Sequence, residues 1–237
     1  MKIHHISDSH CKHSQIRIST DIDLIIHSGD ASNSRNIYEN EKEIRNFITW
    51  YSSLKIPYKI YVAGNHCTSI ANGNITKDNF EQAGIIYLNH ESTEVLGLKI
   101  FGSPYTPSFG NGWAYNIRRD RLHEYWKDIP DNTDIIVTHG PPKGILDLAT
   151  KYYNKQEEGR YYGEIMEYCG DLALLKRIKD INPKLHCFGH IHDNEDNFNS
   201  GIKTTPLIPN TIFSNGSIVK DGQFDKPIIR HGNIITL

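Results

Sequence analysis

The sequence has no long hydrophobic run. No window of its 237 residues approaches the roughly 18 consecutive apolar residues that a membrane-spanning helix requires. The first residues, Met-Lys-Ile-His-His-Ile-Ser-Asp, place polar groups where a secretory signal peptide would have its apolar stretch. We therefore expect a soluble protein of the cytoplasm that has no membrane partner.

The sequence also lacks an excess of charge and a cysteine framework. Lys and Arg number 26 against 28 Asp and Glu, for a net charge of -2. Without a basic field, sequence-independent binding to nucleic acid is disfavoured. The four cysteines contain no Cys-x-x-Cys pair, so we expect free thiols in a reducing compartment rather than disulfides.

Internal repeats, low-complexity tracts and Pro/Gly/Ser-rich linkers are missing as well, so nothing in the sequence marks a domain boundary. A chain of this length can bury roughly 70–75% of its unfolded surface without needing disulfides. We expect residues 1–237 to form a single domain. Histidine, in contrast, is abundant, with 13 residues.

Short β-branched runs alternate with helical patterns along the chain, which is typical of an α/β protein. We expect strands at Lys2–Ser7, Asp23–His27, Lys59–Val62, Ile85–Leu88, Glu94–Leu96, Lys99–Phe101, Asp134–Thr138, Lys184–Phe188 and Thr211–Ser214, and a C-terminal pair around Ile228 and Ile234. We expect helices at Glu39–Ser53, Arg118–Asp128 and Leu172–Ile181. This order favours a layered α/β sandwich over a single doubly wound sheet.

Five of the predicted strands end in the same way, with a small residue beside a group that can bind a metal ion. The strand ends carry Asp8 and His10, then Gly29-Asp30, Gly64-Asn65-His66, His139-Gly140 and Gly189-His190-Ile191-His192. Ligands of open α/β sheets gather at the carboxyl ends of the strands, where glycine allows sharp turns and close approach. If these strands share a sheet, the polar groups converge.

Carboxylate, amide and imidazole ligands together suit Zn, Fe or Mn, whereas Ca prefers oxygen alone. The absence of cysteine from the set argues against a structural zinc site. The set also has more ligands than one tetrahedral ion needs. Two ions that share a bridging carboxylate, roughly 3.5–4 Å apart, would use them all.

With these motifs in this order, the sequence resembles the calcineurin-like metallophosphoesterase superfamily, whose pattern is Asp-x-His, Gly-Asp, Gly-Asn-His-Asp/Glu, His and Gly-His-x-His. The resemblance runs from Asp8 to His192. The stretches Thr138–Gly144 and Phe188–His192 are similar to the branch of metallophosphoesterase-domain proteins with cyclic-nucleotide phosphodiesterase-like members. The resemblance implies a four-layer α/β/β/α sandwich with two mixed β-sheets.

The resemblance also implies the roles of individual residues. One metal would be held by Asp8, His10, Asp30 and His192, and the other by Asp30, Asn65, His139 and His190, with Asp30 as the bridge. The position of His66 matches the family's histidine that does not bind metal and lies near the leaving-group oxygen. We therefore take His66 as the candidate general acid.

Cys67 departs from the family pattern, because it stands where Asp or Glu usually follows Gly-Asn-His. A thiol cannot supply the charge or the hydrogen bonds of a carboxylate, so one interpretation is that His66 is oriented differently here. The other interpretation, which we favour, is that Cys67 is a neutral packing substitution and that His66 is oriented from elsewhere.

The resemblance predicts a metal-dependent phosphoric ester hydrolase in which metal-activated hydroxide attacks phosphorus. We expect a small phosphodiester as the substrate, with cyclic nucleotides among the candidates. Two alternatives stay open: a phosphomonoesterase or broad-specificity phosphatase, and a non-catalytic scaffold that keeps the fold. A nuclease is disfavoured because no stripe of Lys and Arg is visible.

Substrate choice is expected to come from the long segment Ser103–Asn116. Its four aromatic residues could stack against a nucleobase, or they could anchor the loop to the core; they are Tyr105, Phe109, Trp113 and Tyr115. A second aromatic segment, Tyr152–Tyr162, is a candidate for another wall of the site.

Overall fold

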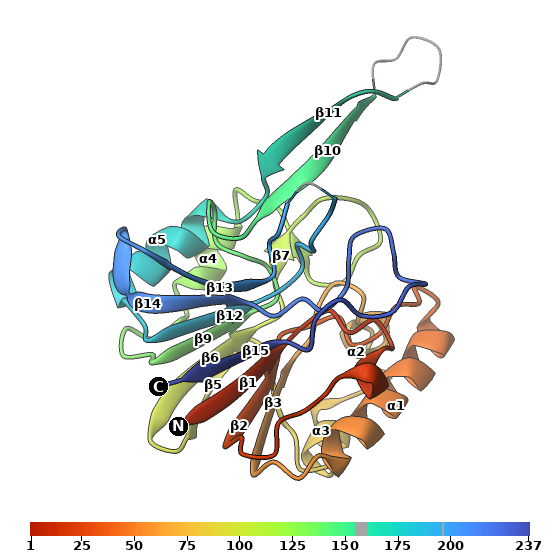
Figure 1. The fold of residues 1–237 in the computed structure, drawn as a ribbon, viewed down its shortest axis with the longest axis vertical. Helices are drawn as coiled ribbons and strands as arrows, with labels where there is room; N and C mark the ends of the chain where they lie inside the picture. The colour runs from red at the N-terminus through yellow and green to blue at the C-terminus, as the bar shows by residue number, and fades with distance from the viewer. Residues whose placement is uncertain (155–160, 196) are drawn as a thin grey trace.

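A computed structural model of the chain describes residues 1–154, 161–195 and 197–237, and of residues 151–154 and 161–165 it describes only the backbone. The predicted second aromatic wall at Tyr152–Tyr162 lies largely outside the residues whose side chains are described. Two β-sheets pack face to face, with helices on their outer surfaces (Figure 1). Among the described helices, none is long and apolar enough to cross a membrane.

The first sheet has five strands, and its centre is parallel. Its order is β15 (Asn233–Thr236), β1 (Lys2–Ile6), β2 (Leu24–His27), β3 (Tyr58–Val62) and β4 (Ile86–Leu88). Only the edge strand β15 runs antiparallel to its neighbour, with Ile3 opposite Ile235. The carboxyl ends of β1, β2 and β3 therefore lie side by side at one edge of the sheet.

The second sheet has six strands and is also mixed. Its order is β13 (Gly201–Thr205), β14 (Ile208–Asn215), β12 (Leu185–Phe188), β9 (Ile135–Thr138), β6 (Leu98–Ser103) and β5 (Glu91–Val95). The four central strands are parallel, whereas β13 and β5 run antiparallel at the edges. The carboxyl ends of β9 and β12 are neighbours, as those of β1 and β2 are in the first sheet.

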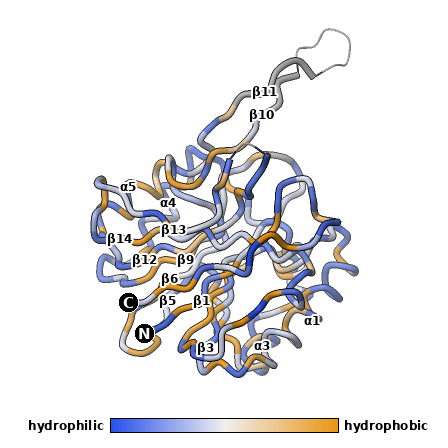
Figure 2. Tube along the Cα trace, in the orientation of Figure 1, coloured by the Kyte–Doolittle hydropathy of each residue, from blue (hydrophilic) through white to orange (hydrophobic). Residues whose placement is uncertain are grey.

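Three separate hydrophobic clusters define four layers. One cluster joins the first sheet to α1 (Ile37–Ser53), α2 (Thr68–Ala71) and α3 (Lys77–Glu81), with the short 3-10 helix η1 (His13–Gln15) beside them. A second, which includes Ile26 and Val137, lies between the two sheets. A third joins the second sheet to α4 (Leu122–Trp126) and α5 (Leu172–Ile181). Figure 2 shows hydrophobic segments along the strands and hydrophilic segments on the outer surface of α1.

Helix α1 shows how the sequence specifies one of these layers. The side chain of Asn36 caps its first turn by accepting hydrogen bonds from the backbone N–H groups of Tyr38 and Glu39. Its buried face presents Ile44, Phe47 and Tyr51 to the first sheet, at the spacing of an amphipathic helix. Because the Tyr51 hydroxyl lies 2.9 Å from a carbonyl oxygen of β3, this buried polar group is satisfied.

The predicted strands and helices agree with the structure in all but two places. The predicted helix Arg118–Asp128 is shorter, because the short strand β8 (Asn116–Ile117) pairs with β7 (Thr106–Pro107) just before it. The predicted strand around Ile228 is wrong. There the backbone N–H of Ile228 donates to the side chain of Gln15, and that of Ile229 donates to the carbonyl oxygen of the loop residue Ile218. These β-branched residues therefore pair with loops rather than with a strand.

A β-hairpin that we did not predict extends from the sandwich (Figure 1). Its arms are β10 (Leu148–Asn154) and β11 (Tyr161–Tyr168), which pair antiparallel with Ala149 opposite Glu167. The base of the hairpin is tied to the sandwich by the guanidinium group of Arg119, which donates to the carbonyl oxygens of Cys169 and Gly170. The hairpin base is therefore fixed next to the carboxyl ends of the second sheet.

Burial of His186 makes the free energy of unfolding depend on pH. His186 lies in β12 with its Nε2 2.8 Å from the hydroxyl of Thr138, and burial lowers its pKa from 6.5 to about 3. The unfolded chain binds this proton below pH 6.5, but the folded chain binds it only near pH 3. The contribution of the neutral, buried His186 to the free energy of unfolding is therefore lost progressively as the pH falls from 6.5 to about 3.

We predict that His186→Gln weakens this pH dependence. Gln can still donate to Thr138 but cannot gain a proton. Between about pH 7 and about pH 5, wild type should lose about 2 kcal/mol more stability than the variant, as measured by urea unfolding. The other buried histidines are common to both proteins and cancel in the comparison. Equal losses in both proteins would contradict the prediction.

Candidate metal centre

The predicted site residues converge where the carboxyl ends of the two sheets meet. Asp8 and His10 follow β1, Asp30 follows β2, and Asn65 follows β3, all in the first sheet. The second sheet contributes His139 after β9 and both His190 and His192 after β12. All seven side chains thus reach one place from five strands, and no one element holds the site by itself.

Left-handed backbone conformations turn several of these side chains into the site. Asp8, His10, Asp30 and His190 have φ angles of 52°, 39°, 55° and 70°. Such angles are uncommon for residues other than glycine and cost of order 1–3 kcal/mol each. Four of the seven candidate ligands therefore have a strained backbone, which the surrounding sheets hold in place. Such strain is typical of functional sites.

Two motif glycines are required because the candidate ligands pack against their backbone. A Cβ on Gly64 would lie 2.3 Å from Oδ1 of Asp30, and a Cβ on Gly189 would lie 2.1 Å from Oδ2 of Asp8. Neither separation is possible for real atoms, so any larger residue would displace a carboxylate. These glycines therefore set the position of the two aspartates.

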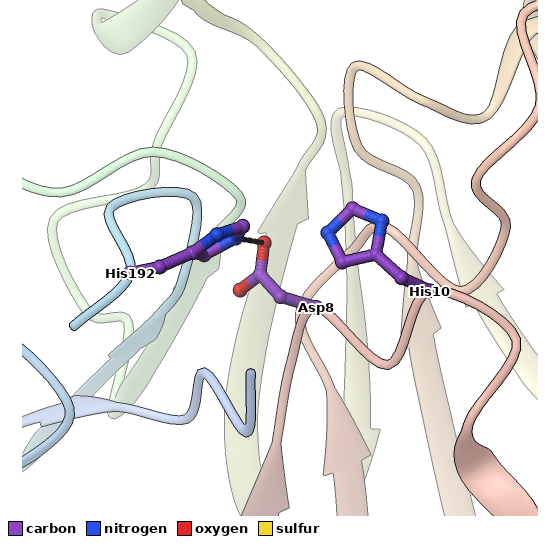
Figure 3. Close-up of side chains that lie close together, drawn as sticks. All are labelled: Asp8, His10 and His192. Atoms are coloured by element: carbon purple, nitrogen blue, oxygen red, sulfur yellow. Dashed lines mark hydrogen bonds and ion pairs between the residues drawn. The ribbon is translucent and has the colours of Figure 1, made fainter. Parts of the chain in front are cut away.

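The first cluster consists of Asp8, His10 and His192. Figure 3 shows the carboxylate of Asp8 between the two imidazole rings. Nε2 of His192 lies 3.1 Å from Oδ1 of Asp8. The same carboxylate accepts the backbone N–H of His190 at 3.0 Å, so it is held by the loop of the opposite sheet.

The second cluster consists of Asp30, His139 and His190. Nε2 of His139 lies 3.2 Å from Oδ2 of Asp30 and 2.9 Å from Oδ1 of Asn65, which brings the predicted amide ligand into the same cluster. Asp30 also groups with His10 and His66. It therefore lies between the two clusters, as the predicted bridging ligand would.

The hydrogen bonds of His10 and His139 fit a metal ion. In each ring Nδ1 faces a backbone carbonyl, that of Ser32 at 3.2 Å for His10 and that of Ser28 at 2.9 Å for His139. Nδ1 must therefore carry the proton, which leaves Nε2 with a lone pair directed into the cluster. Nε2 of His10 is buried and has no hydrogen-bond partner among the residues that the structure describes, which is the arrangement of a ligand atom.

Electrostatics in the second cluster favours a cation. Burial opposes a positive charge on His139, yet the carboxylates of Asp30 and Asp8 outweigh burial and raise its pKa to about 9. Burial likewise opposes a negative charge on Asp30, but His139 and His66 keep the pKa of Asp30 well below its usual range. The site stabilises positive charge between these side chains, where a divalent ion would replace the proton.

His66 lies at the edge of the first cluster rather than within it. Its ring is 4.7 Å from the ring of His10, and its backbone N–H donates to Oδ1 of Asp30 at 2.7 Å. Nδ1 of His66 lies 3.0 Å from the carbonyl oxygen of Asn33, so Nδ1 is held as a donor to this carbonyl and Nε2 is the nitrogen left to exchange a proton with an incoming group. This position agrees with a residue that moves a proton at the leaving-group oxygen.

The structure supports the packing interpretation of Cys67. The thiol is fully buried, with Sγ 3.1 Å from the hydroxyl of Tyr61 and 3.3 Å from the backbone nitrogen of Gly64. The ring of His66 is instead oriented by the Asn33 carbonyl, and its backbone oxygen accepts from the side chain of Asn40 at 2.6 Å. Asn33 and Asn40 take over the orienting task, and no sequence pattern identified them.

The aromatic residues of Ser103–Asn116 divide into two pairs. Phe109 and Trp113 face the site, with ring centroids 5.1 Å from His190 and 4.6 Å from His66. Tyr105 packs against Tyr125 instead, and the Tyr115 hydroxyl lies 3.4 Å from that of Tyr87. The anchoring interpretation is therefore confirmed for Tyr105 and Tyr115, whereas stacking against a nucleobase stays a prediction for Phe109 and Trp113.

A further aromatic residue at the site, Phe224, was missed. Its ring centroid lies 4.6 Å from that of His10 and 5.6 Å from that of His192. It comes from an irregular C-terminal segment without hydrophobic periodicity, so the sequence offered no signal for it.

Comparison with known proteins now assigns the family. The sequence profile of the calcineurin-like phosphoesterases matches residues 1–194, most of the chain. The chain belongs to this family. The resemblance read from the motifs is thus confirmed, and the buried His/Asp clusters are consistent with a metallophosphoesterase site.

Individual relatives agree with this assignment. The chain is 31% identical over 212 residues to metallophosphoesterase domain-containing protein 1 of Homo sapiens, an alignment that covers 79% of this chain and 59% of the human protein. It is 29% identical over 217 residues to UPF0046 protein K07C11.7 of Caenorhabditis elegans, covering 86% of this chain and 68% of that protein. The chain therefore spans less than two thirds of the human protein.

A solved structure shows the same fold. The crystal structure of TT1561 of Thermus thermophilus matches with a TM-score of 0.55 at 14% identity, covering 90% of this chain and 88% of that one. The predicted α/β class with two mixed sheets is confirmed. The metal-ligand roles of the seven site residues remain predictions that the geometry above supports.

We predict that Asp30→Asn abolishes most of the stabilisation that divalent ions give to this protein. An ion at about 100 times its dissociation constant should stabilise wild type by about 2.7 kcal/mol. The amide of Asn removes the negative charge that both clusters share, so the rise in melting temperature on adding Mn²⁺ or Zn²⁺ should largely disappear.

The matched control is Asp120→Asn, because Asp120 lies on the surface and pairs only with Arg118 among the described ion pairs. It should keep the full metal-induced rise, and calorimetric titration of wild type should give two ions per chain. An undiminished rise in Asp30→Asn would show that Asp30 does not hold the ions.

Proposed function

We propose that the protein is a metal-dependent phosphodiesterase that hydrolyses a small phosphodiester, with two divalent ions (Mn, Fe or Zn) in the two His/Asp clusters. The observation that carries the proposal is the position of Asp30, which groups with His10 and His66 at the first cluster and with His139 and His190 in the second. A single carboxylate that serves two nitrogen-rich clusters is the arrangement that a pair of ions needs.

Asp8, His10, Asp30 and His192 would hold one ion, and Asp30, Asn65, His139 and His190 would hold the other. Divalent ions held there supply Lewis acidity, which polarises a phosphoryl oxygen and makes water a better nucleophile. The chain itself contributes only two carboxylates among these seven side chains. Part of the positive charge of the ions is therefore left to attract an anionic phosphoester.

His66 is the group of the chain that is placed to protonate the leaving oxygen. The Asn33 carbonyl fixes its ring through Nδ1, and the ring packs against Trp113 at 4.6 Å, so Nε2 is the ring nitrogen left to act on an ester; with both ring nitrogens protonated it can serve as an acid. A proton delivered from Nε2 would neutralise the alkoxide as the bond from phosphorus to oxygen breaks.

The aromatic surroundings favour a diester over a monoester. Phe109 lies at His190, and Trp113 lies at His66, so apolar surface borders the clusters on two sides. A diester has an organic arm for each side, whereas a monoester has only one. The second arm gives the diester an additional apolar contact, which is worth about 1–3 kcal/mol for a group of modest size.

We predict that bis(4-nitrophenyl) phosphate is hydrolysed with a kcat/KM at least about tenfold above that of 4-nitrophenyl phosphate. Both esters release the same coloured product, so initial rates with Mn²⁺, Zn²⁺ or Fe²⁺ compare them directly. The rate of hydrolysis by Asp30→Asn is subtracted as the background rate. The reverse preference would identify a phosphatase, and turnover of neither ester with any of the ions would favour a non-catalytic scaffold.

We also predict that His66→Gln affects substrates in proportion to how much their leaving group needs a proton. For a phenyl or alkyl leaving group kcat should fall about 10²–10⁴-fold, because the departing oxygen is strongly basic. For a 4-nitrophenyl leaving group, which departs without a proton, the decrease should be much smaller.

His123→Gln is the control, because His123 is exposed on α4. It should leave both reactions unchanged. Equal decreases for the two kinds of leaving group in His66→Gln would show that His66 has another role, such as holding the substrate.

A further inference from the structure

A cavity of about 590 Å³ opens beside the second cluster, between the Ser103–Asn116 loop and the base of the β-hairpin. Phe109 and Pro107 line it on the side of the loop. Ala149, Thr150 and Glu167 line it on the side of the hairpin. Its volume lies within the range of about 300–1,000 Å³ that is usual for pockets that bind small molecules.

The cavity is continuous with the candidate metal centre on one side only. His190 and His192 form part of its wall, whereas neither His66 nor Trp113 is among the described residues that line it. The cavity therefore begins at the clusters and leads away from the proton donor. A phosphodiester centred on the clusters with its leaving oxygen toward His66 must direct its other ester arm elsewhere, and this cavity is the available space on that side.

We propose that the cavity binds the ester arm that stays on phosphorus, and that this arm is an uncharged, flat organic group of about nucleoside size. The inference rests on the proposed phosphodiesterase function and adds the identity of the retained arm. In the reaction, water adds to phosphorus and gives up one proton to solvent, the bond to the leaving oxygen breaks, and that oxygen takes a proton from His66, which solvent then replaces. The products are an alcohol and a phosphomonoester whose organic arm is still in the cavity.

The side chains that line the cavity indicate what kind of organic group the retained arm is. The side chain of Phe109 is 53% exposed, so its ring offers an open face for stacking. Polar edges come from Thr150 and Asn194, whose side chains lie 3.4 Å apart. A ring system with an apolar face and a few polar edge groups matches this combination.

The charges of the walls argue against a further phosphate on the arm. Arg119 lines the cavity, but its guanidinium group is already engaged by the carbonyl oxygens of Cys169 and Gly170. Among the described lining residues, Glu167 and Asp221 place two carboxylates in the same walls against the single guanidinium group of Arg119. A second anionic group in the cavity would face these carboxylates, whereas an uncharged arm would not.

Ala149→Trp tests the proposal by filling the cavity from the hairpin without changing any candidate ligand or His66. The substrates are two 4-nitrophenyl diesters with the same leaving group, one retaining a methyl arm and one retaining thymidine through its 5′ oxygen. Wild type should prefer the thymidine ester. In the variant, kcat/KM for the thymidine ester should fall at least about tenfold, while the methyl ester should change less than about twofold.

Phe109→Leu keeps the loop apolar but removes the stacking face, and it serves if Ala149→Trp does not fold. It should reduce the preference for the thymidine ester about tenfold or more, the usual effect of losing one stacked ring. Leu207→Trp is the control for the added indole, since Leu207 is half exposed in the turn before β14 and does not line the cavity.

The outcomes separate this inference from the function on which it rests. If wild type hydrolyses neither diester with any of the three ions, the phosphodiesterase assignment fails. If wild type hydrolyses both, but Ala149→Trp or Phe109→Leu lowers the two rates equally, the assignment survives and the cavity is not the site of the retained arm. A wild-type preference for the methyl ester would also overturn the inference.

Discussion

The buried carboxylate of Asp30 is the interaction on which the rest of the site depends. It is 2% exposed, and an uncompensated charge at such a position would cost several kcal/mol. Its Oδ1 accepts the backbone N–H of His66, and its Oδ2 lies 3.2 Å from Nε2 of His139 in the opposite sheet. One negative charge therefore connects the two sheets, the two clusters and the proton donor, and a divalent ion on either side would complete its compensation.

Such a charge is tolerated because the layer beneath it is polar and rigid. His5 in β1 lies 2.9 Å from the hydroxyl of Ser28 and 2.7 Å from that of Ser214 in β14, so its ring links the two sheets directly below the clusters. His27 and His186 lie on the helix-facing sides of the two sheets, where His27 packs 4.8 Å from the ring of Phe47 and His186 packs 4.9 Å from that of Phe188, each also beside one hydroxyl. Much of the histidine surplus is thus explained without metal: neutral buried imidazoles satisfy hydroxyl groups and hold the strand ends, with their left-handed turns, in register.

How much of this was predictable depends on how local each signal is. The convergence of the candidate ligands could be predicted, because each follows a β-branched strand and parallel strands bring their carboxyl ends together. The residues that orient His66 could not be predicted. Asn33 acts through its backbone carbonyl, which has no sequence signature, and Asn40 donates from α1 to the backbone carbonyl of His66. Phe224 follows the last ligand by 32 residues in an irregular segment, and the hairpin comes from a stretch that we interpreted only as aromatic. In both cases tertiary contacts, not local pattern, decide the position.

The segment that carries Phe224 lies beyond residues 1–194, the part that matches the family profile, yet it is anchored to the ligand loop itself. Asp193 directly follows the ligand His192, and its buried carboxylate accepts from the backbone of Asn199 and from Arg230, at 2.6 Å and 3.3 Å. Its backbone oxygen accepts the N–H of Asp221 at 2.8 Å, three residues before Phe224. A shift of His192 would therefore move the aromatic wall as well. The family motifs supply the clusters, and under the proposed function the loops joined to them in this way are the elements that decide which ester arms reach the phosphorus.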